Sequence, residues 1–79
     1  MSNLEKYNEV FIKTLALDDN FDKSKINQKE VSDWDSIGHM ELITSLEDAF
    51  DIMFDMEDIL AFTSYDEGVQ LLRKYNIEL

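Results

Sequence analysis

The chain has 79 residues, enough for one small domain, 1–79, built around a single core. Hydrophobic residues make up 44% of it, too large a share for a disordered acidic tail, so we expect a folded domain. A domain of this size has no room for a large active-site cleft walled by its own core, and we therefore do not expect an enzyme. The sequence has no proline, repeat or low-complexity run that would divide it.

The formal net charge of −11 argues against several classes of partner. Nucleic acids and anionic membrane surfaces are bound through basic patches, so neither is expected to bind. Proteins with basic patches are favoured, because long-range attraction steers the two charged surfaces together. The absence of cysteine excludes disulfides and a cysteine-based zinc site.

The start of the chain has no apolar signal core, and no stretch approaches the length of a membrane-spanning helix. We therefore expect a cytoplasmic monomer with no stable membrane insertion.

The first predicted element is an amphipathic helix from about Asn3 to Ala16. Its apolar stripe follows helical spacing and consists of Leu4, Tyr7, Phe11, Thr14 and Leu15. Ser2, followed three residues later by Glu5, has the spacing of a capping box.

Residues 17–34 show no clean periodicity and predict a long loop. Turn-favouring residues punctuate it, at Asp18, Asp19, Asn20, Asn27 and Ser32. The irregularly spaced apolar residues predict anchors that hold the loop on a core, and they are Phe21, Ile26, Val31 and Trp34. Loops of this length without structure of their own tend to be functional.

The strongest helix prediction covers Ser36 to Phe50, with Asp35 as its N-cap. At 100° per residue, the inward face holds Leu42, Leu46, Ala49 and Phe50, with Ile43 at its edge. The opposite face holds Ile37, Met40, Glu41, Thr44, Glu47 and Asp48. Apolar side chains among carboxylates are typical of a docking surface.

A short third helix is predicted from Met56 to Phe62, followed by a fourth that ends near Tyr75 or Asn76. Either Thr63 or Ser64 has the spacing of a capping box at the start of the fourth helix. Its predicted buried stripe is Tyr65, Gly68, Val69 and Leu72. Between Lys29 and Arg73 the sequence has no basic residue, so the negative field centres on the second and third helices.

From Asp35 to Leu72 the sequence resembles the acyl carrier protein family, which is marked by Asp-Ser-Leu at the start of its second helix. The resemblance is carried by Asp35-Ser36-Ile37-Gly38-His39-Met40-Glu41-Leu42, by Leu46-Glu47-Asp48-Ala49-Phe50-Asp51, by Phe54, by Glu57-Asp58 and by Phe62-Thr63-Ser64-Tyr65. It implies an all-α, four-helix bundle of the acyl-carrier type, with three longer helices, a short third helix and a long loop between the first two.

The resemblance also implies a function. A phosphopantetheinyl transferase would use coenzyme A to attach 4'-phosphopantetheine to Ser36, framed by Asp35 and Ile37. The thiol of the arm would carry acyl or aminoacyl groups as thioesters to acyl-activating and acyl-transferring enzymes. The position suits a phosphate, because the first turn of a helix offers free N–H groups and a positive dipole end.

Two further sets of residues follow from the resemblance. Basic patches of partner enzymes would meet Glu41, Glu47 and Asp48, with apolar contacts from Ile37 and Met40. A cleft for the acyl chain would be lined by Leu46, Phe54, Ile59, Phe62, Val69 and Leu72, together with Gly68. Because several of these side chains are large, we expect a small cleft and a short or polar cargo. Fatty acyl, polyketide, aminoacyl and sugar-modifying acyl groups all stay open.

Gly38 and His39 depart from the family pattern. Gly38 would remove a side chain beside the prosthetic arm, which bears on partner recognition. We interpret His39 as a packed, hydrogen-bonded residue and not as a metal ligand, because a metal site needs several ligands. Its place near a helix N-terminus favours a neutral ring.

Two alternatives from other classes remain. The chain could be an acidic helical adaptor that is never modified, in which case Ser36 would be dispensable. It could also bind calcium, because Asp33, Asp35 and Gly38 match the first, third and sixth positions of an EF-hand loop. The fifth and twelfth positions, Ile37 and Thr44, lack the oxygen ligands that such a loop requires, and we expect no metal site.

Overall fold

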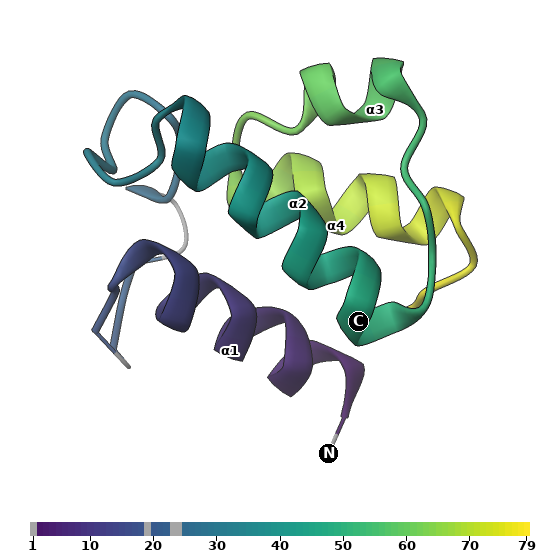
Figure 1. The fold of residues 1–79 in the computed structure, drawn as a ribbon. Coiled ribbons are helices and arrows are strands. Elements are labelled where there is room, and N and C mark those ends of the chain that lie inside the picture. Colours follow the sequence, from purple (N-terminus) through teal and green to yellow (C-terminus); the bar gives the residue numbers. More distant parts are fainter. Residues whose placement is uncertain (1, 19, 23–24) are drawn as a thin grey trace.

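The computed structural model describes residues 2–18, 20–22 and 25–79, and in it the chain is all-α, as predicted. Its four helices are α1 (Asn3–Leu15), α2 (Ser36–Phe50), α3 (Met56–Ala61) and α4 (Tyr65–Lys74) (Figure 1). Extended pairing among the described residues is limited to one isolated bridge between Asn27 and Ser64. Asp19, one of the predicted turn residues, lies outside the described residues.

The first helix begins where the sequence predicted and ends one residue early. Ser2 caps it, because its hydroxyl oxygen accepts a hydrogen bond from the Glu5 N–H at 3.2 Å and its hydroxyl donates to the Glu5 carboxylate. Ala16 adopts a left-handed conformation with φ of 54° while its N–H bonds the carbonyl of Ile12. Leu15 is therefore the last helical residue, since the left-handed turn redirects the chain into the loop.

Both predicted ends of α2 are confirmed. Asp35 caps the start and Asp51, in a left-handed conformation with φ of 54°, closes the end. The prediction for α3 ran one residue too long, because Phe62 leaves the helical conformation (ψ of 79°) and is fully buried. Of the two candidate caps of α4, Ser64 is the one used, and its hydroxyl accepts from the Glu67 N–H at 3.1 Å.

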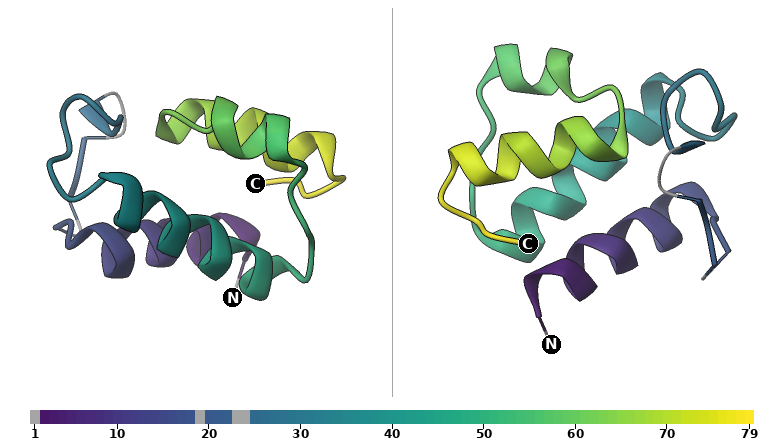
Figure 2. Two further views of the ribbon diagram at one scale, coloured as in Figure 1. Left: turned by 45° about the horizontal axis from the view of Figure 1, so that its top comes forward. Right: turned by 180° about the vertical axis from the view of Figure 1, so that it is seen from behind.

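The helices enclose one core in which aromatic rings predominate. In Figures 1 and 2, α1 and α2 lie side by side and run in opposite directions, α4 packs behind α2, and α3 lies at the edge. Tyr7 and Phe11 of α1 pack against rings from the rest of the chain. Phe11 meets Trp34 edge-on at 5.6 Å, and Tyr7 meets Tyr65 in a tilted arrangement at 4.8 Å between ring centroids. The buried apolar residues are Tyr7, Phe11, Leu15, Ile26, Trp34, Leu42, Ile43, Leu46, Phe54, Phe62, Tyr65 and Leu72.

The predicted stripes are confirmed at their centres and weaken at their ends. Leu4, assigned to the buried stripe of α1, is exposed, and Thr14 is half-buried. Ala49 and Phe50 at the end of α2 are also half-buried. Helix ends lie at the rim of so small a core, where the partner helix no longer covers them.

The described part of the loop 17–34 is held on the core, as predicted. Ile26 and Trp34 are buried, and Phe21 and Val31 pack partly buried against the same cluster. Backbone bonds fasten the loop to the α3–α4 junction: the Gln28 N–H donates to the Thr63 carbonyl at 3.1 Å, and the Tyr65 N–H donates to the Ile26 carbonyl at 2.8 Å. The loop thus delivers a fixed backbone to the start of α2.

Gly68 allows α4 to pack tightly on α1 and Phe62. A Cβ at this position would lie 2.1 Å from the Tyr7 hydroxyl oxygen and 2.3 Å from the Phe62 ring. The Tyr7 hydroxyl donates to the Tyr65 carbonyl at 2.6 Å, and its burial raises the pKa of Tyr7 far above the ordinary value. Over the described residues, no helix has both the length and the apolar character needed to cross a bilayer.

Candidate functional site

The N-terminus of α2 presents a serine whose hydroxyl is not needed for the fold. Capping is done by Asp35, whose carboxylate oxygen Oδ1 accepts from the Gly38 N–H at 2.8 Å. Ser36 is the first residue of the helix and is exposed, and no described residue forms a hydrogen bond with its hydroxyl. Beside it, Ile37 is 73% exposed. The hydroxyl is therefore open to another protein.

Gly38 packs against the loop that precedes α2. It is buried, and a Cβ at this position would lie 2.1 Å from the carbonyl oxygen of Asp33. Its lack of a side chain lets the loop backbone close tightly over the first turn of α2. The loop thus occupies the place of the missing side chain, and the expected effect of Gly38 on partner recognition stays a prediction. Gly38 helps to fix the backbone that presents Ser36.

His39 joins the loop to both α2 and α3. Its Nδ1 accepts from the indole N–H of Trp34 at 2.9 Å, and its Nε2 lies 2.8 Å from the carbonyl oxygen of Ile59. Because the indole N–H only donates and the carbonyl only accepts, the proton must be on Nε2 and the ring is neutral. The interpretation of His39 as a packed, hydrogen-bonded residue is confirmed.

Two grooves open at Ser36. The larger, about 710 Å³, lies between α1 and α2 and is lined by Lys13, Thr14, Ser36, Ile37, Met40, Glu41, Thr44 and Ser45. The smaller, about 510 Å³, lies between α2 and α3 and is lined by Gln28, Trp34, Asp35, Ser36, His39, Met40, Met56, Ile59 and Leu60. We call them the α1–α2 groove and the α2–α3 groove. Ser36 and Met40 line both, so a group on Ser36 has access to either.

The predicted partner face is only partly as expected. Ile37, Met40, Glu41 and Asp48 are exposed, with Met40 half accessible to solvent. Glu47 is half-buried, and its Oε2 accepts from the backbone N–H of Phe54 at 2.9 Å. This carboxylate therefore holds the segment that connects α2 to α3.

Three exposed apolar residues extend this face and were missed by the sequence analysis. Met53, Met56 and Leu60 lie on the α2–α3 connection and on α3, and each is at least 70% exposed. The i, i+4 spacing of Met56 and Leu60 was the available signal, because it places both on one side of a helix. Exposed methionines suit surfaces that adapt to more than one partner.

The residues predicted to line an acyl cleft come together in the core. Leu46, Phe62 and Leu72 are fully buried, and Phe54 is nearly so. Ile59 and Val69 pack partly buried against the same cluster. The Phe54 ring packs on Phe62 and Tyr75, with centroids 6.1 and 5.3 Å apart. Ile59 is the member of this set that also lines the α2–α3 groove.

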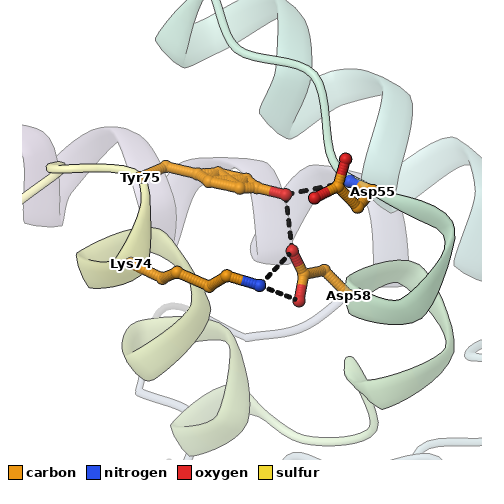
Figure 3. A network of polar contacts seen from close by, with 4 residues as sticks. All are labelled: Asp55, Asp58, Lys74 and Tyr75. Carbon is orange, nitrogen blue, oxygen red and sulfur yellow. Dashed lines mark hydrogen bonds and ion pairs between the residues drawn. The ribbon is translucent and has the colours of Figure 1, made fainter.

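A second polar cluster ties α3 to the end of α4 (Figure 3). Asp58 is 5% exposed, and its carboxylate accepts from the Lys74 ammonium at 3.0 and 3.1 Å and from the Tyr75 hydroxyl. The Tyr75 hydroxyl oxygen in turn accepts from the Asp55 N–H at 2.9 Å. The hydrogen bonds from Tyr75 and then Lys74 lower the pKa of Asp58 below its ordinary value. Asp58 is thus paired within the fold, although the sequence analysis counted it in the open negative field.

Within the part of the chain that the structure describes, no group of three or more His, Cys, Asp or Glu side chains is placed to hold a metal ion.

Comparisons of the chain with protein-family models, with curated proteins and with solved structures each returned no match. The function is therefore inferred from the geometry of the site and from the sequence pattern around it.

Proposed function

We propose that the chain is an acyl carrier protein that bears 4'-phosphopantetheine on Ser36. The observation that carries the proposal is the separation of roles at the start of α2. Asp35 caps the helix, so the exposed hydroxyl of the next residue has no task in the fold. The four-helix arrangement, with its short third helix and anchored first loop, is compatible with an acyl-carrier bundle.

The residues around Ser36 fit a phosphodiester. The N–H groups of Ser36 and Ile37 belong to the first turn of α2 and have no partner within the helix. These N–H groups lie at the positive end of the helix dipole, where an anion is stabilised. Exposure of Ser36 and Ile37 leaves room for a transferase to approach.

The modification is a transfer of phosphopantetheine from coenzyme A. The Ser36 oxygen forms a bond to the phosphorus that bears pantetheine, the pyrophosphate bond of coenzyme A breaks, and adenosine bisphosphate leaves. The hydroxyl proton passes to a base of the transferase. This chain contributes the presented hydroxyl and the surface on which the transferase docks, and the arm supplies a thiol for thioester formation.

Partner enzymes would dock on the exposed face around Ser36. Ile37 and Met40 provide apolar contact area on α2, and Met56 and Leu60 extend it on α3. Carboxylates such as Glu41 border this area and would pair with basic residues of the partner. Because Phe54 and Phe62 fill the space where a long acyl chain would lie, short or polar cargo is favoured.

The first prediction tests the modification itself. Incubation with coenzyme A and a broad-specificity phosphopantetheinyl transferase should add the mass of one phosphopantetheine, measured on the intact protein. Ser36→Ala should gain nothing. Ser32→Ala, which removes an exposed serine of the loop, is the matched control and should be loaded fully. Loading that persists in Ser36→Ala, or no loading of the folded protein by two different transferases, would reject the carrier function.

An unmodified adaptor is the second candidate, and the exposed apolar residues favour it specifically. Ile37, Met53, Met56 and Leu60 would bind a partner whether or not Ser36 carries a group. The two candidates separate in one comparison. An adaptor loses no function in Ser36→Ala and loses partner binding in Ile37→Ser, whereas a carrier fails with either substitution.

A further inference from the structure

The two grooves at Ser36 differ in chemistry, and the difference indicates where a group attached to this serine would rest. Ser36, Met40 and Thr44 are spaced four residues apart along α2, and so are Ile37, Glu41 and Ser45. Together they form one floor of the α1–α2 groove, which at 1.5 Å per residue extends about 13 Å from Ser36 to Ser45. The last turn of α1 contributes Lys13 and Thr14 as the facing wall.

We propose that the phosphopantetheine arm on Ser36 rests in the α1–α2 groove, with Lys13 pairing its phosphate. The inference depends on the proposed carrier function, since that function supplies the arm. It assigns Lys13 and the groove hydroxyls as residues that bind and orient the prosthetic group.

The donor set of the α1–α2 groove matches the arm group by group. The arm carries one anionic phosphodiester, two amides and a pair of methyl groups. Lys13 is the positively charged residue among the described residues that line this groove, and it offers ammonium donors to the phosphate. The hydroxyls of Thr14, Thr44 and Ser45 can donate to or accept from amides, while Ile37 and Met40 offer apolar surface to the methyl groups.

The charges near Lys13 permit this pairing. Its ammonium forms an ion pair with Glu9 at 2.8 Å on the surface of α1, four residues away, and the Lys13 side chain is 73% exposed. An exposed pair of this kind is weak, so the ammonium can turn toward a phosphate. Glu41 also lines the groove and opposes an anion there, which makes the cation of Lys13 the deciding charge.

The α2–α3 groove is a poorer match for the arm. None of the described residues that line it is lysine or arginine. Both ring nitrogens of His39 are already committed, to Trp34 and to the Ile59 carbonyl. Gln28 could meet an amide of the arm, but Asp35 opposes an anion, and side chains such as Met56 and Leu60 are apolar. The groove therefore offers the phosphate no cation.

A resting arm in the α1–α2 groove would cover part of the partner face. Ile37 and Met40 line that groove and are also the exposed apolar residues of α2. A partner that docks on them would displace the arm and so release the cargo when an enzyme is present.

The test uses the loaded protein and needs no partner enzyme. Because the chain has no cysteine, the arm carries the only thiol, and a nitroxide maleimide will label it alone. Two-dimensional ¹H–¹⁵N spectra should then lose intensity at Lys13, Thr14 and Ser45 more than at Met56 and Leu60. Lys13→Gln should reduce the loss at Thr14. Lys29→Gln removes the same charge from an exposed site outside the α1–α2 groove and should leave the loss unchanged.

A second measurement avoids the bulky label. In the unlabelled loaded protein, nuclear Overhauser contacts are expected between the methyl groups of the arm and those of Thr14 and Ile37. Greatest intensity loss at Met56 and Leu60 would overturn the proposal in favour of the α2–α3 groove. Even, weak loss over the surface without these contacts would overturn it in favour of a solvated arm.

Unchanged behaviour of Lys13→Gln would remove Lys13 from the binding set. Intact-mass measurement before labelling separates the two proposals. Failure to load counts against the carrier function, whereas loading with no contact to α1 counts against the groove alone.

Discussion

The start of α2 and the contact between α3 and the end of α4 are built in opposite ways. At the start of α2, the hydroxyl of Ser36 and the side chain of Ile37 face solvent. Where α3 meets the C-terminal end of α4, Asp58 is buried and satisfied by Lys74 and Tyr75 (Figure 3). Polar groups that find a partner within the chain stabilise it, and those left exposed are available to other molecules. The comparison therefore separates residues that hold this fold from those that are left available to other molecules.

The largest effect on stability is expected from Gly38→Ala, which disturbs the packing of the loop on the start of α2. The added methyl would lie 2.1 Å from the Asp33 carbonyl oxygen, which belongs to backbone and cannot simply rotate away. We expect the free energy of unfolding to fall by about 3 kcal/mol, at the upper end of the cost of overpacking. Urea denaturation will measure it. Thr44→Ala, on the exposed face of α2, is the control and should lie within about 0.5 kcal/mol of the parent.

Asp58→Asn should weaken the contact between α3 and the end of α4. The amide keeps the shape of the side chain but has no negative charge, and only one of its two end atoms can accept a hydrogen bond. The two oxygens of Asp58 that accept from Lys74 and Tyr75 are therefore not both replaced. We expect a loss of about 2 kcal/mol, since hydrogen bonds to charged groups contribute more than neutral ones. Asp48→Asn, an exposed acid of α2, is the matched control and should change little. Equal effects of the two substitutions would show that the Asp58 cluster does not stabilise α3.

The same cluster predicts a pH dependence of stability with a definite sign. The pKa of Asp58 is lowered in the folded chain, so its contribution is complete above the ordinary value of 3.8 and is lost as pH falls through the lowered folded value. Burial and then the hydrogen bond to Asp58 raise the pKa of Tyr75, so its contribution is present below the ordinary value of 10.0 and is lost as pH rises through the raised value.

Thermal melts of the parent and of Asp58→Asn measure this dependence. The melting temperature of the parent should exceed that of Asp58→Asn by a constant amount from about pH 4 to pH 10, and this difference should shrink outside that range. A difference that grows below pH 4 would contradict the assignment.

The smallest effect concerns the exposed acids. With a formal net charge of −11, repulsion among surface carboxylates opposes the compact state. Added magnesium should raise the melting temperature at neutral pH and low salt, because it screens and binds these groups weakly. Sodium chloride of equal ionic strength is the control for screening alone. A melting temperature that magnesium leaves unchanged would remove this contribution.

Helix caps and helix bounds could be predicted accurately from the sequence. The caps Ser2, Asp35 and Ser64 all lie where a side-chain oxygen can reach an N–H two or three residues on, a relation set within one turn. The bounds of α2 and the centres of the buried stripes follow from the same short-range periodicity. Ser36 was also selected from the sequence, by its motif and by its position directly after the N-cap.

Contacts that reach beyond one helical turn could not be predicted from the sequence pattern. The helical pattern around Gly38 does not predict that the Asp33 carbonyl packs against it. The pattern around Glu47 likewise does not predict its hydrogen bond with the Phe54 N–H. In the sequence, Asp58 cannot be distinguished from the other acids. Its role follows from the fold, which places Lys74 and Tyr75 beside it.

The sequence by itself thus determined the helices, their caps and the candidate serine, because these depend on neighbours within about four residues. Only the tertiary structure decided which acids stay open, which glycine is a packing contact and which grooves meet at Ser36. These depend on how segments more than one helical turn apart in the chain pack together, and no pattern within one turn specifies that packing.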